Sequence, residues 1–342
     1  MHVFSAAKML GICLVLLCTP ALAAKEAERP DAASVSKLRQ LLSQPEDSID
    51  LAQAKVAIDR MVDSSVDELG TLRELDRWAA KVRARFPPDA SNKQKVDLMI
   101  STLYQAGPWN DNRPFAYDFT DPFGNDLHNA LLSTYLERRQ GQCTVMPIAI
   151  VLLGQKLGLP MTLTTAPFHL IAKYGDEELG AWTNLDATSG LFHPDSGYEQ
   201  ALNISPAAIQ NEIFLRPYTR RESVAVFATA VLIPYYLQEN DPYLAIQIID
   251  LILDANPKDV FAMMLKSNAY IMLVDQRFRS KYPLAEQIPA AEQPEFLAHN
   301  RNISQWRLKA EALGWQEWTQ ADWDKYLEHF EQQKLNKLRR SK

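Results

Sequence analysis

The chain has 342 residues, enough for two domains or for one domain with helical extensions. Hydrophobic residues make up 47% and charged residues 23%, a globular composition that excludes a largely disordered chain. The formal net charge of −6 offers no basic face of the kind that nucleic-acid binding requires, so we expect no nucleic-acid partner.

Residues 1–23 have the pattern of a secretory signal peptide. Lys8 supplies a positive charge, and residues 10–17 form an apolar run that is too short to span a bilayer. Ala21 and Ala23 are the small residues that a signal peptidase reads. We therefore expect cleavage after Ala23 and a periplasmic or secreted protein. No later run of about 18 apolar residues occurs, so we expect no transmembrane segment in the mature chain.

Cleavage changes the cysteine count. Cys13 and Cys18 lie in the predicted signal peptide, so Cys143 is the one cysteine of the mature sequence. A single cysteine in an exported chain makes no internal disulfide; it is a reactive thiol, one half of an intermolecular bridge, or a small buried hydrophobe. Lipid attachment at Cys18 is disfavoured, because the large Leu17 precedes it where such motifs carry a small residue.

Helical periodicity dominates the next part of the chain. Apolar residues recur every three to four positions from residue 35 to 85, and two prolines end this pattern. A further amphipathic helix is expected over residues 93–105. Residues 106–126 form a loop rich in Gly, Pro and aromatic residues, which is either a satellite hydrophobic cluster or a wall of a substrate cleft. Trp109 in this loop is a candidate substrate-binding residue.

The segment around Cys143 predicts a thiol at the start of a helix. Residues 128–139 are predicted to be helical, and Gly141 permits a sharp turn before an apolar helix that runs to Leu157. Pro147 is tolerated only within a first helical turn, so this helix begins near Cys143. A helix N-terminus favours the thiolate, and the Cys143 N–H would serve as an oxyanion donor.

The period then changes to that of strands, expected over residues 161–165, 168–174 and 181–185. His169 opens the second strand and Asp186 follows the third. If the hairpin is symmetric about the centre of its turn, the two lie opposite each other, about 5 Å apart at Cβ. A carboxylate in that position orients an imidazole and stabilises its charged form. A register slip of one residue would place them on opposite faces.

The remainder of the chain predicts a loop from residue 191 to about 222 and helices beyond it. Two helices joined at Asn256 resemble one tetratricopeptide-type hairpin within residues 223–275. We expect a signal peptide at residues 1–23, an N-terminal helical region at 24–92, a core at 93–222 and a C-terminal helical region at 223–342.

Three motifs together resemble the transglutaminase-like superfamily: the segment from Gly141 to Cys143 with its helix, the segment 168–170, and the segment 182–188. Residues 136–139 and the helical tail are similar to its SirB-type branch, and the resemblance covers roughly residues 38–275. It implies an α+β fold with a papain-like core, in which the cysteine-bearing helix packs on a small antiparallel sheet flanked by helices.

The resemblance also implies acyl-thioester chemistry on protein or peptide amides, as in a cysteine hydrolase or an acyltransferase. Cys143 attacks the carbonyl carbon, His169 moves the proton and Asp186 orients His169. Gln142 and Trp182 join Trp109 as substrate-binding or oxyanion candidates. The acyl acceptor, water or an amine, stays open, and so does calcium dependence.

The alternative is a non-catalytic binding module, in which the C-terminal helices and the aromatic loop hold a protein partner. No phosphate-binding glycine loop occurs, so we expect no cofactor. The histidines outside the motifs and the predicted signal peptide lack metal-ligand spacing, so we expect no metal site; they are His128, His193, His299 and His329.

Overall fold

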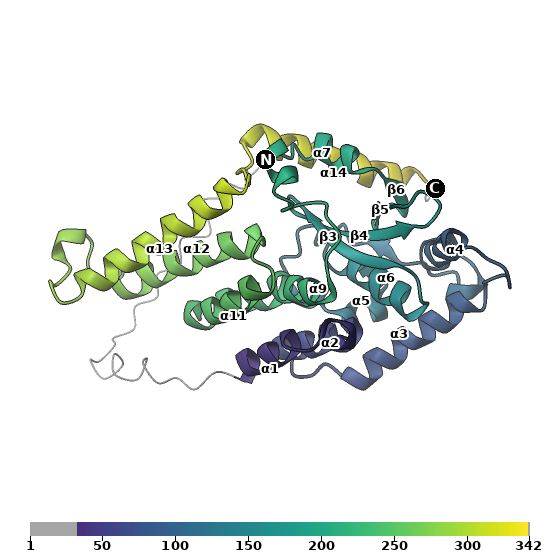
Figure 1. Ribbon diagram of the computed structural model, residues 1–342, viewed down its shortest axis with the longest axis horizontal. Helices are drawn as coiled ribbons and strands as arrows, with labels where there is room; N and C mark the ends of the chain where they lie inside the picture. Colours follow the sequence, from purple (N-terminus) through teal and green to yellow (C-terminus); the bar gives the residue numbers. More distant parts are fainter. Residues whose placement is uncertain (1–32, 341–342) are drawn as a thin grey trace.

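The computed structural model describes residues 33–340 (Figure 1). The predicted signal peptide lies outside the described residues. Within them, no helix is both long enough and apolar enough to cross a membrane.

The α-helices are α1 (Ala33–Leu42), α2 (Leu51–Val62), α3 (Glu68–Arg83), α4 (Asn92–Tyr104), α5 (Leu132–Arg138), α6 (Val145–Lys156), α7 (Asp195–Ala201), α8 (Pro206–Gln210), α9 (Arg220–Phe227), α10 (Ile233–Gln238), α11 (Pro242–Ala255), α12 (Val260–Val274), α13 (Gln293–Ala312) and α14 (Gln320–Arg340). The strands are β1 (Ala116–Tyr117), β2 (Gln140–Gly141), β3 (Met161–Ala166), β4 (His169–Asp176), β5 (Ala181–Asp186) and β6 (Leu191–His193).

The helices predicted before residue 160 are confirmed, and local side chains explain where they begin. The side chains of Asp50 and Asp67 accept hydrogen bonds from backbone N–H groups in the first turns of α2 and α3. Ser91 and Gln94 form a capping box at the start of α4. These caps satisfy N–H groups that a helix leaves unpaired, so each helix has a defined first residue.

A four-stranded antiparallel sheet, in the order β3–β4–β5–β6, forms the centre of the fold. One face packs on the apolar helix α6, with the side chains of Leu163, Ala172 and Leu185 fully buried in the main core. The other face carries Ile171, which is buried in a second core with residues of the 202–215 segment and of α12. Figure 1 shows α6 below the sheet and α7 and α14 above it.

A short parallel pair, β1 with β2, joins the aromatic loop to the segment that precedes Cys143. Ala116 pairs with Gln140, and Tyr117 pairs with Gly141. The loop is thereby placed beside the candidate nucleophile. This position favours its role as a wall of a site over its role as a remote satellite cluster.

The prediction of a loop from residue 191 to about 222 is wrong in part, because β6, α7 and α8 lie within it. These elements have three to seven residues, too few to show a hydrophobic period. α8 did carry a local signal: Ser205 caps the helix and Pro206 occupies its first position.

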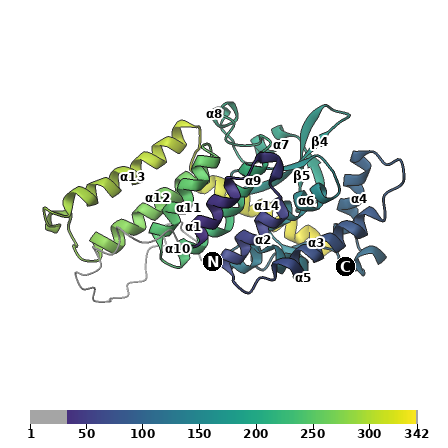
Figure 2. The same cartoon turned by 60° about the horizontal axis from the view of Figure 1, so that its bottom comes forward.

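Antiparallel helices make up the C-terminal region. α11 and α12 meet at Asn256 and Pro257, as the sequence predicts, and α13 packs against α12. Gly314 ends α13 at φ +101°, and a Cβ there would lie 2.4 Å from the backbone nitrogen of Ala208. Only glycine fits this approach, so the chain turns sharply before α14. Figure 2 shows α13 extending away from the sheet, and Figure 1 shows α14 running back above it.

Candidate active site

Cys143 lies immediately before the helix α6. Thr144 is the N-cap, and the N–H of Met146 donates to the carbonyl of Gln142 at 3.2 Å, so the first helical turn extends back past the cysteine. Pro147 is the third residue of α6 and therefore lies in the first turn, as predicted. The thiol is half-buried. The prediction of a cysteine at a helix start is confirmed.

Gly141 is needed at this site because no side chain fits there. Its backbone is outside the left-handed region, contrary to the expectation of a sharp turn that requires glycine. A Cβ at this position would lie 2.6 Å from the ring of Tyr135 and 2.7 Å from the side chain of Val145. The missing side chain thus lets α5 and α6 approach each other just before Cys143.

The turn between β3 and β4 brings the strand of His169 to Cys143. Ala166 pairs with His169, which leaves Pro167 and Phe168 as a two-residue turn. Phe168 has φ +57°, a left-handed conformation that is uncommon for a bulky residue. Its carbonyl oxygen lies 3.8 Å from the Sγ of Cys143, within hydrogen-bonding distance for a thiol donor. His169 is the next residue of the chain.

The expected direct opposition of His169 and Asp186 is wrong. Ala172 pairs with Leu185, and the same register sets Asp186 opposite Ile171, two residues beyond His169. The cause is the turn, which is centred one residue later than the sequence suggested. The carboxylate of Asp176 accepts from two backbone N–H groups of this turn.

Because the displacement is two residues, the two side chains still share a face. They are diagonal neighbours, residues that lie about 7–8 Å apart with their Cβ atoms somewhat closer. Side chains at such positions are close enough for long ones to meet, and the pairing of His169 with Asp186 stays a prediction.

Asp186 is an organised carboxylate at the end of β5. Its Oδ1 accepts from the N–H and the hydroxyl of Thr188, both at 2.8 Å, and its Oδ2 accepts from the hydroxyl of Ser189 at 2.8 Å. Its negative charge contributes to the raised pKa of Tyr104, Tyr198 and Cys143. The carboxylate is therefore electrostatically coupled to the thiol.

The Cys143 thiol is held in its protonated form in this state. Burial raises its pKa to about 11, its own backbone N–H lowers the pKa, and Asp186 raises it. Desolvation outweighs the benefit of the helix N-terminus, because a thiolate loses more hydration than one N–H restores. Attack by this sulfur therefore requires a base that accepts its proton.

Gln142, Trp109 and Trp182 have different surroundings. Gln142 is buried, and neither its Oε1 nor its Nε2 has a hydrogen-bond partner. Trp109 stacks on the guanidinium of Arg85 at 3.8 Å and donates to the carbonyl of Gln105. Trp182 is 42% exposed on β5, opposite Gly175. An unpaired amide beside the cysteine suits an oxyanion donor, and the roles of all three residues stay predictions.

Sequence reasoning missed the aromatic residues that α14 brings to the site. The ring of Tyr326 in α14 lies 5.7 Å from the ring of His169. Burial raises the pKa of Tyr326 and of Tyr117, and the neighbouring Cys143 raises both further, so both phenols lie near the thiol. Tyr326 lies 183 positions after Cys143, and no local pattern signals such a contact.

Within residues 33–340, no group of three or more potential metal-ligating side chains is found. Two cavities are found that neither Cys143 nor His169 lines: one of about 400 Å³ beside Trp315 and one of about 310 Å³ beside Arg113. The guanidinium of Arg113 donates to backbone carbonyls of α5, and that of Arg139 donates to the carbonyls of Asn110 and Arg113. These arginines are therefore engaged by the protein itself.

Three comparisons with known proteins were made, and one of them matches the part of the chain that holds the candidate site. A search of curated proteins gives no match. Among solved structures, the chain is similar to menin, described as "Crystal structure of menin reveals the binding site for Mixed Lineage Leukemia (MLL) protein", with 15% identity and a TM-score of 0.41 over 80% of this chain and 69% of that one. The family model of the transglutaminase-like superfamily matches residues 70–226, a little under half of the chain. Residues 70–226, which include Cys143, His169 and Asp186, therefore form a transglutaminase-like domain.

Proposed function

We propose that the protein is an exported cysteine enzyme that acts on protein or peptide amides through an acyl-thioester. Cys143 is the nucleophile, His169 moves the proton and Asp186 orients His169. The observation that carries this proposal is the convergence of the three residues in one transglutaminase-like domain: Cys143 precedes α6, its sulfur lies against the turn that leads into His169, and Asp186 is electrostatically coupled to it.

The chemistry follows from these positions. The sulfur of Cys143 attacks the amide carbonyl carbon as its proton passes to His169. The backbone N–H of Cys143 and the amide of Gln142 stabilise the negative oxygen of the tetrahedral intermediate. The C–N bond then breaks, and His169 returns the proton to the leaving amine. Water or a second amine releases the acyl group from the sulfur.

The test is capture of the acyl-enzyme. A reactive acyl probe with a peptide moiety is expected to label wild-type protein at Cys143, to fail on Cys143→Ala, and to label His169→Ala at least tenfold more slowly, because general-base catalysis contributes about 10²–10⁴-fold. Thr144→Ala is a matched control, since Thr144 caps α6 without a side-chain hydrogen bond. Equal labelling of wild type and His169→Ala contradicts the proposal.

The second candidate function is a non-catalytic binding module with a protein partner on its C-terminal helices. The raised pKa of Cys143 favours it, because a protonated thiol is a poor nucleophile. In this case the wild type binds its partner normally after Cys143→Ala, and no variant forms an acyl-enzyme. The tetratricopeptide-like and SirB-type assignments are also proposals. The first is supported by the α11–α12 hairpin and the second by residues 136–139.

Export is part of the proposal. It is supported by the sequence pattern of residues 1–23. Sequencing the N-terminus of the protein purified from its native compartment is expected to begin at Ala24. An intact N-terminus in the cytoplasmic fraction would remove export from the proposal.

A further inference from the structure

α14, the last helix that the structure describes, lies near the candidate nucleophile. α14 places Phe330 against three rings of the aromatic loop, at centroid distances of 5.9 Å to Tyr117, 5.4 Å to Phe119 and 6.2 Å to Phe123. Tyr326, one turn earlier, faces His169. α14 therefore bridges the aromatic loop on one side of Cys143 and the β3–β4 turn on the other.

The start of α14 makes the contact with the turn. Trp318 and Trp323 lie 4.5 Å and 4.6 Å from the ring of Phe168, the residue whose carbonyl faces the sulfur. We call Tyr117, Phe119, Phe123 and Phe168 the aromatic surface. Trp323, Tyr326 and Phe330 are spaced i, i+3 and i+7, which is the spacing of one face of a helix that docks on an apolar surface.

The packing of α14 on the aromatic surface has the properties of a contact that another helix could replace. Among the α14 side chains that the structure describes, Phe330 is the one that is buried, while Leu327 and Leu335 are 40% and 45% exposed. Phe123 and Phe168 stay 52% and 42% exposed with α14 in place. A helix that belonged permanently to the core would bury a wide apolar stripe.

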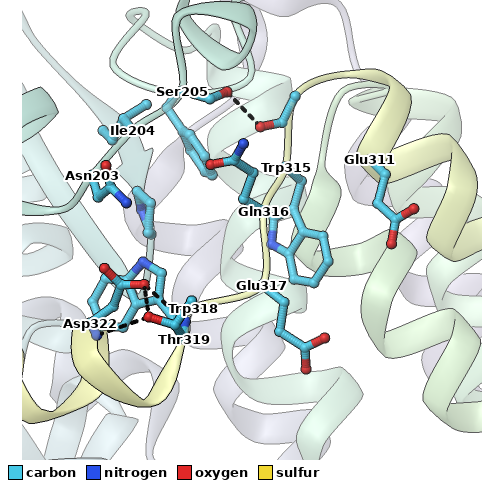
Figure 3. A pocket seen from close by; sticks show the side chains of 13 residues that line it. Asn203, Ile204, Ser205, Glu311, Trp315, Gln316, Glu317, Trp318, Thr319 and Asp322 are labelled. Atoms are coloured by element: carbon cyan, nitrogen blue, oxygen red, sulfur yellow. Dashed lines mark hydrogen bonds between the residues drawn. The ribbon is translucent and has the colours of Figure 1, made fainter.

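The junction before α14 is anchored, so the helix can leave while its start stays attached. The hydroxyl of Ser205 donates to the carbonyl of Gly314 at 2.7 Å, and Asn211 donates to the carbonyl of Leu313 at 3.1 Å. Figure 3 shows this junction, with Thr319 and Asp322 hydrogen-bonded at the start of α14. The cavity of about 400 Å³ lies at this junction.

We propose that the aromatic surface beside Cys143 is a binding site for an amphipathic helix, and that α14 is its resident occupant. The external ligand is a helical peptide segment with aromatic side chains at positions i, i+3 and i+7. The idea that the bound helix is a substrate rests on the proposed acyl-transfer function. Binding of the helix itself does not depend on that function. A ligand helix displaces α14 and exposes the thiol to the peptide that it carries.

Alkylation of Cys143 by iodoacetamide in the full chain tests the proposal. The label is quantified on the proteolytic peptide that contains Cys143, since Cys13 and Cys18 also occur in the sequence. Phe330→Ala removes three ring contacts and is expected to raise the alkylation rate about tenfold. Leu335→Ala, an exposed apolar residue of the same helix, is the matched control and leaves the rate unchanged.

The second arm supplies the helix from outside. A synthetic peptide of residues 317–340 is expected to slow alkylation of Phe330→Ala to near the wild-type rate, while a scrambled peptide has no effect. Wild type responds weakly, because its own tethered helix competes at an effective concentration of about millimolar. If Phe330→Ala does not fold, as judged by its unfolding transition, Trp323→Ala replaces it in both arms.

Two results would overturn the inference: equal alkylation rates in Phe330→Ala and Leu335→Ala, or failure of the peptide to slow the faster variant. Neither arm uses turnover. A protein that shows both expected effects but forms no acyl-enzyme keeps the helix-binding site and loses the proposed function. A protein that forms an acyl-enzyme without these effects does the reverse.

Discussion

The sulfur of Cys143 lies 3.8 Å from the carbonyl oxygen of Phe168. This contact joins the segment before α6 to the turn that leads into His169, and it uses a backbone atom rather than a side chain. Phe168 holds its carbonyl there from a left-handed conformation at φ +57°. Such conformations cost about 1–3 kcal/mol and persist where the surrounding structure imposes them.

The first prediction separates this backbone strain from the Phe168 ring. Phe168→Gly and Phe168→Val both remove the ring, but only glycine adopts a positive φ without cost. We expect Phe168→Val to have a free energy of unfolding about 1–2 kcal/mol lower than that of Phe168→Gly, measured by denaturant titration. Both variants should expose Cys143 to alkylation, because both lose the contacts with Trp318 and Trp323. Equal stabilities would show that the turn relaxes without the ring.

The second prediction concerns the charge beside the thiol. Asp186→Asn removes a negative charge that raises the pKa of Cys143. The thiolate is then easier to form, so the pKa falls from about 11 and the pH profile of alkylation moves to lower pH. Turnover should fall at the same time, because the amide orients His169 poorly.

Glu178→Gln is the matched control for Asp186→Asn. Glu178 lies in the turn between β4 and β5, at the end of the hairpin away from Cys143. We expect its alkylation profile to coincide with that of wild type. A shift of the Asp186→Asn profile to higher pH would contradict the electrostatic coupling between Asp186 and Cys143.

The elements that the sequence predicted well are those with long periodic patterns. α1 to α6 and β3 to β5 follow the predicted order, and Pro147 located the start of α6 to within two residues. The hairpin register was displaced by two residues, because it depends on how the turn after Asp176 is closed. Side chains alternate between the two faces of a strand, so a shift of two residues keeps Asp186 on the predicted face and changes only the residue opposite it.

The surroundings of the site could not be predicted in the same way. A capping box at Thr319 and Asp322 is visible in the sequence and marks where α14 begins. It says nothing about where that helix docks, because the contact between Tyr326 and His169 joins residues 157 positions apart. Only the tertiary structure shows which surface α14 contacts.

The third prediction tests the close approach at Gly141. Gly141→Ala introduces a Cβ within 2.6 Å of Tyr135 and 2.7 Å of Val145, both buried. We expect a loss of about 1–3 kcal/mol in the free energy of unfolding, because α5 and α6 must move apart. Gly175→Ala is the matched control, since its Cβ would meet its neighbours at 3.4 Å or more. Its unfolding midpoint should stay close to that of wild type.

The fourth prediction concerns the buried ion pair that attaches α2 to the start of α5. Lys55 and Asp59 are fully buried and hydrogen-bonded to each other. Lys55 also donates to the carbonyl of Ala130 at 3.1 Å, and Asp59 accepts from the N–H of Leu132 at 2.8 Å. Lys55→Met leaves the carboxylate without its cation, and we expect a loss of about 3–5 kcal/mol in the free energy of unfolding at neutral pH.

The stability of Lys55→Met is expected to depend on pH. Burial already raises the pKa of Asp59, and Lys55 lowers it, so the variant raises the pKa further. A carboxyl with a raised pKa in the folded state destabilises the protein as the pH rises through that pKa, because only the unfolded chain ionises freely. Lys55→Met should therefore be more stable at pH 5 than at pH 8. Arg77→Met, which breaks the exposed pair with Glu74, should cost less than about 1 kcal/mol at both values. A Lys55→Met protein with equal stability at pH 5 and pH 8 would mean that water reaches Asp59 in the variant.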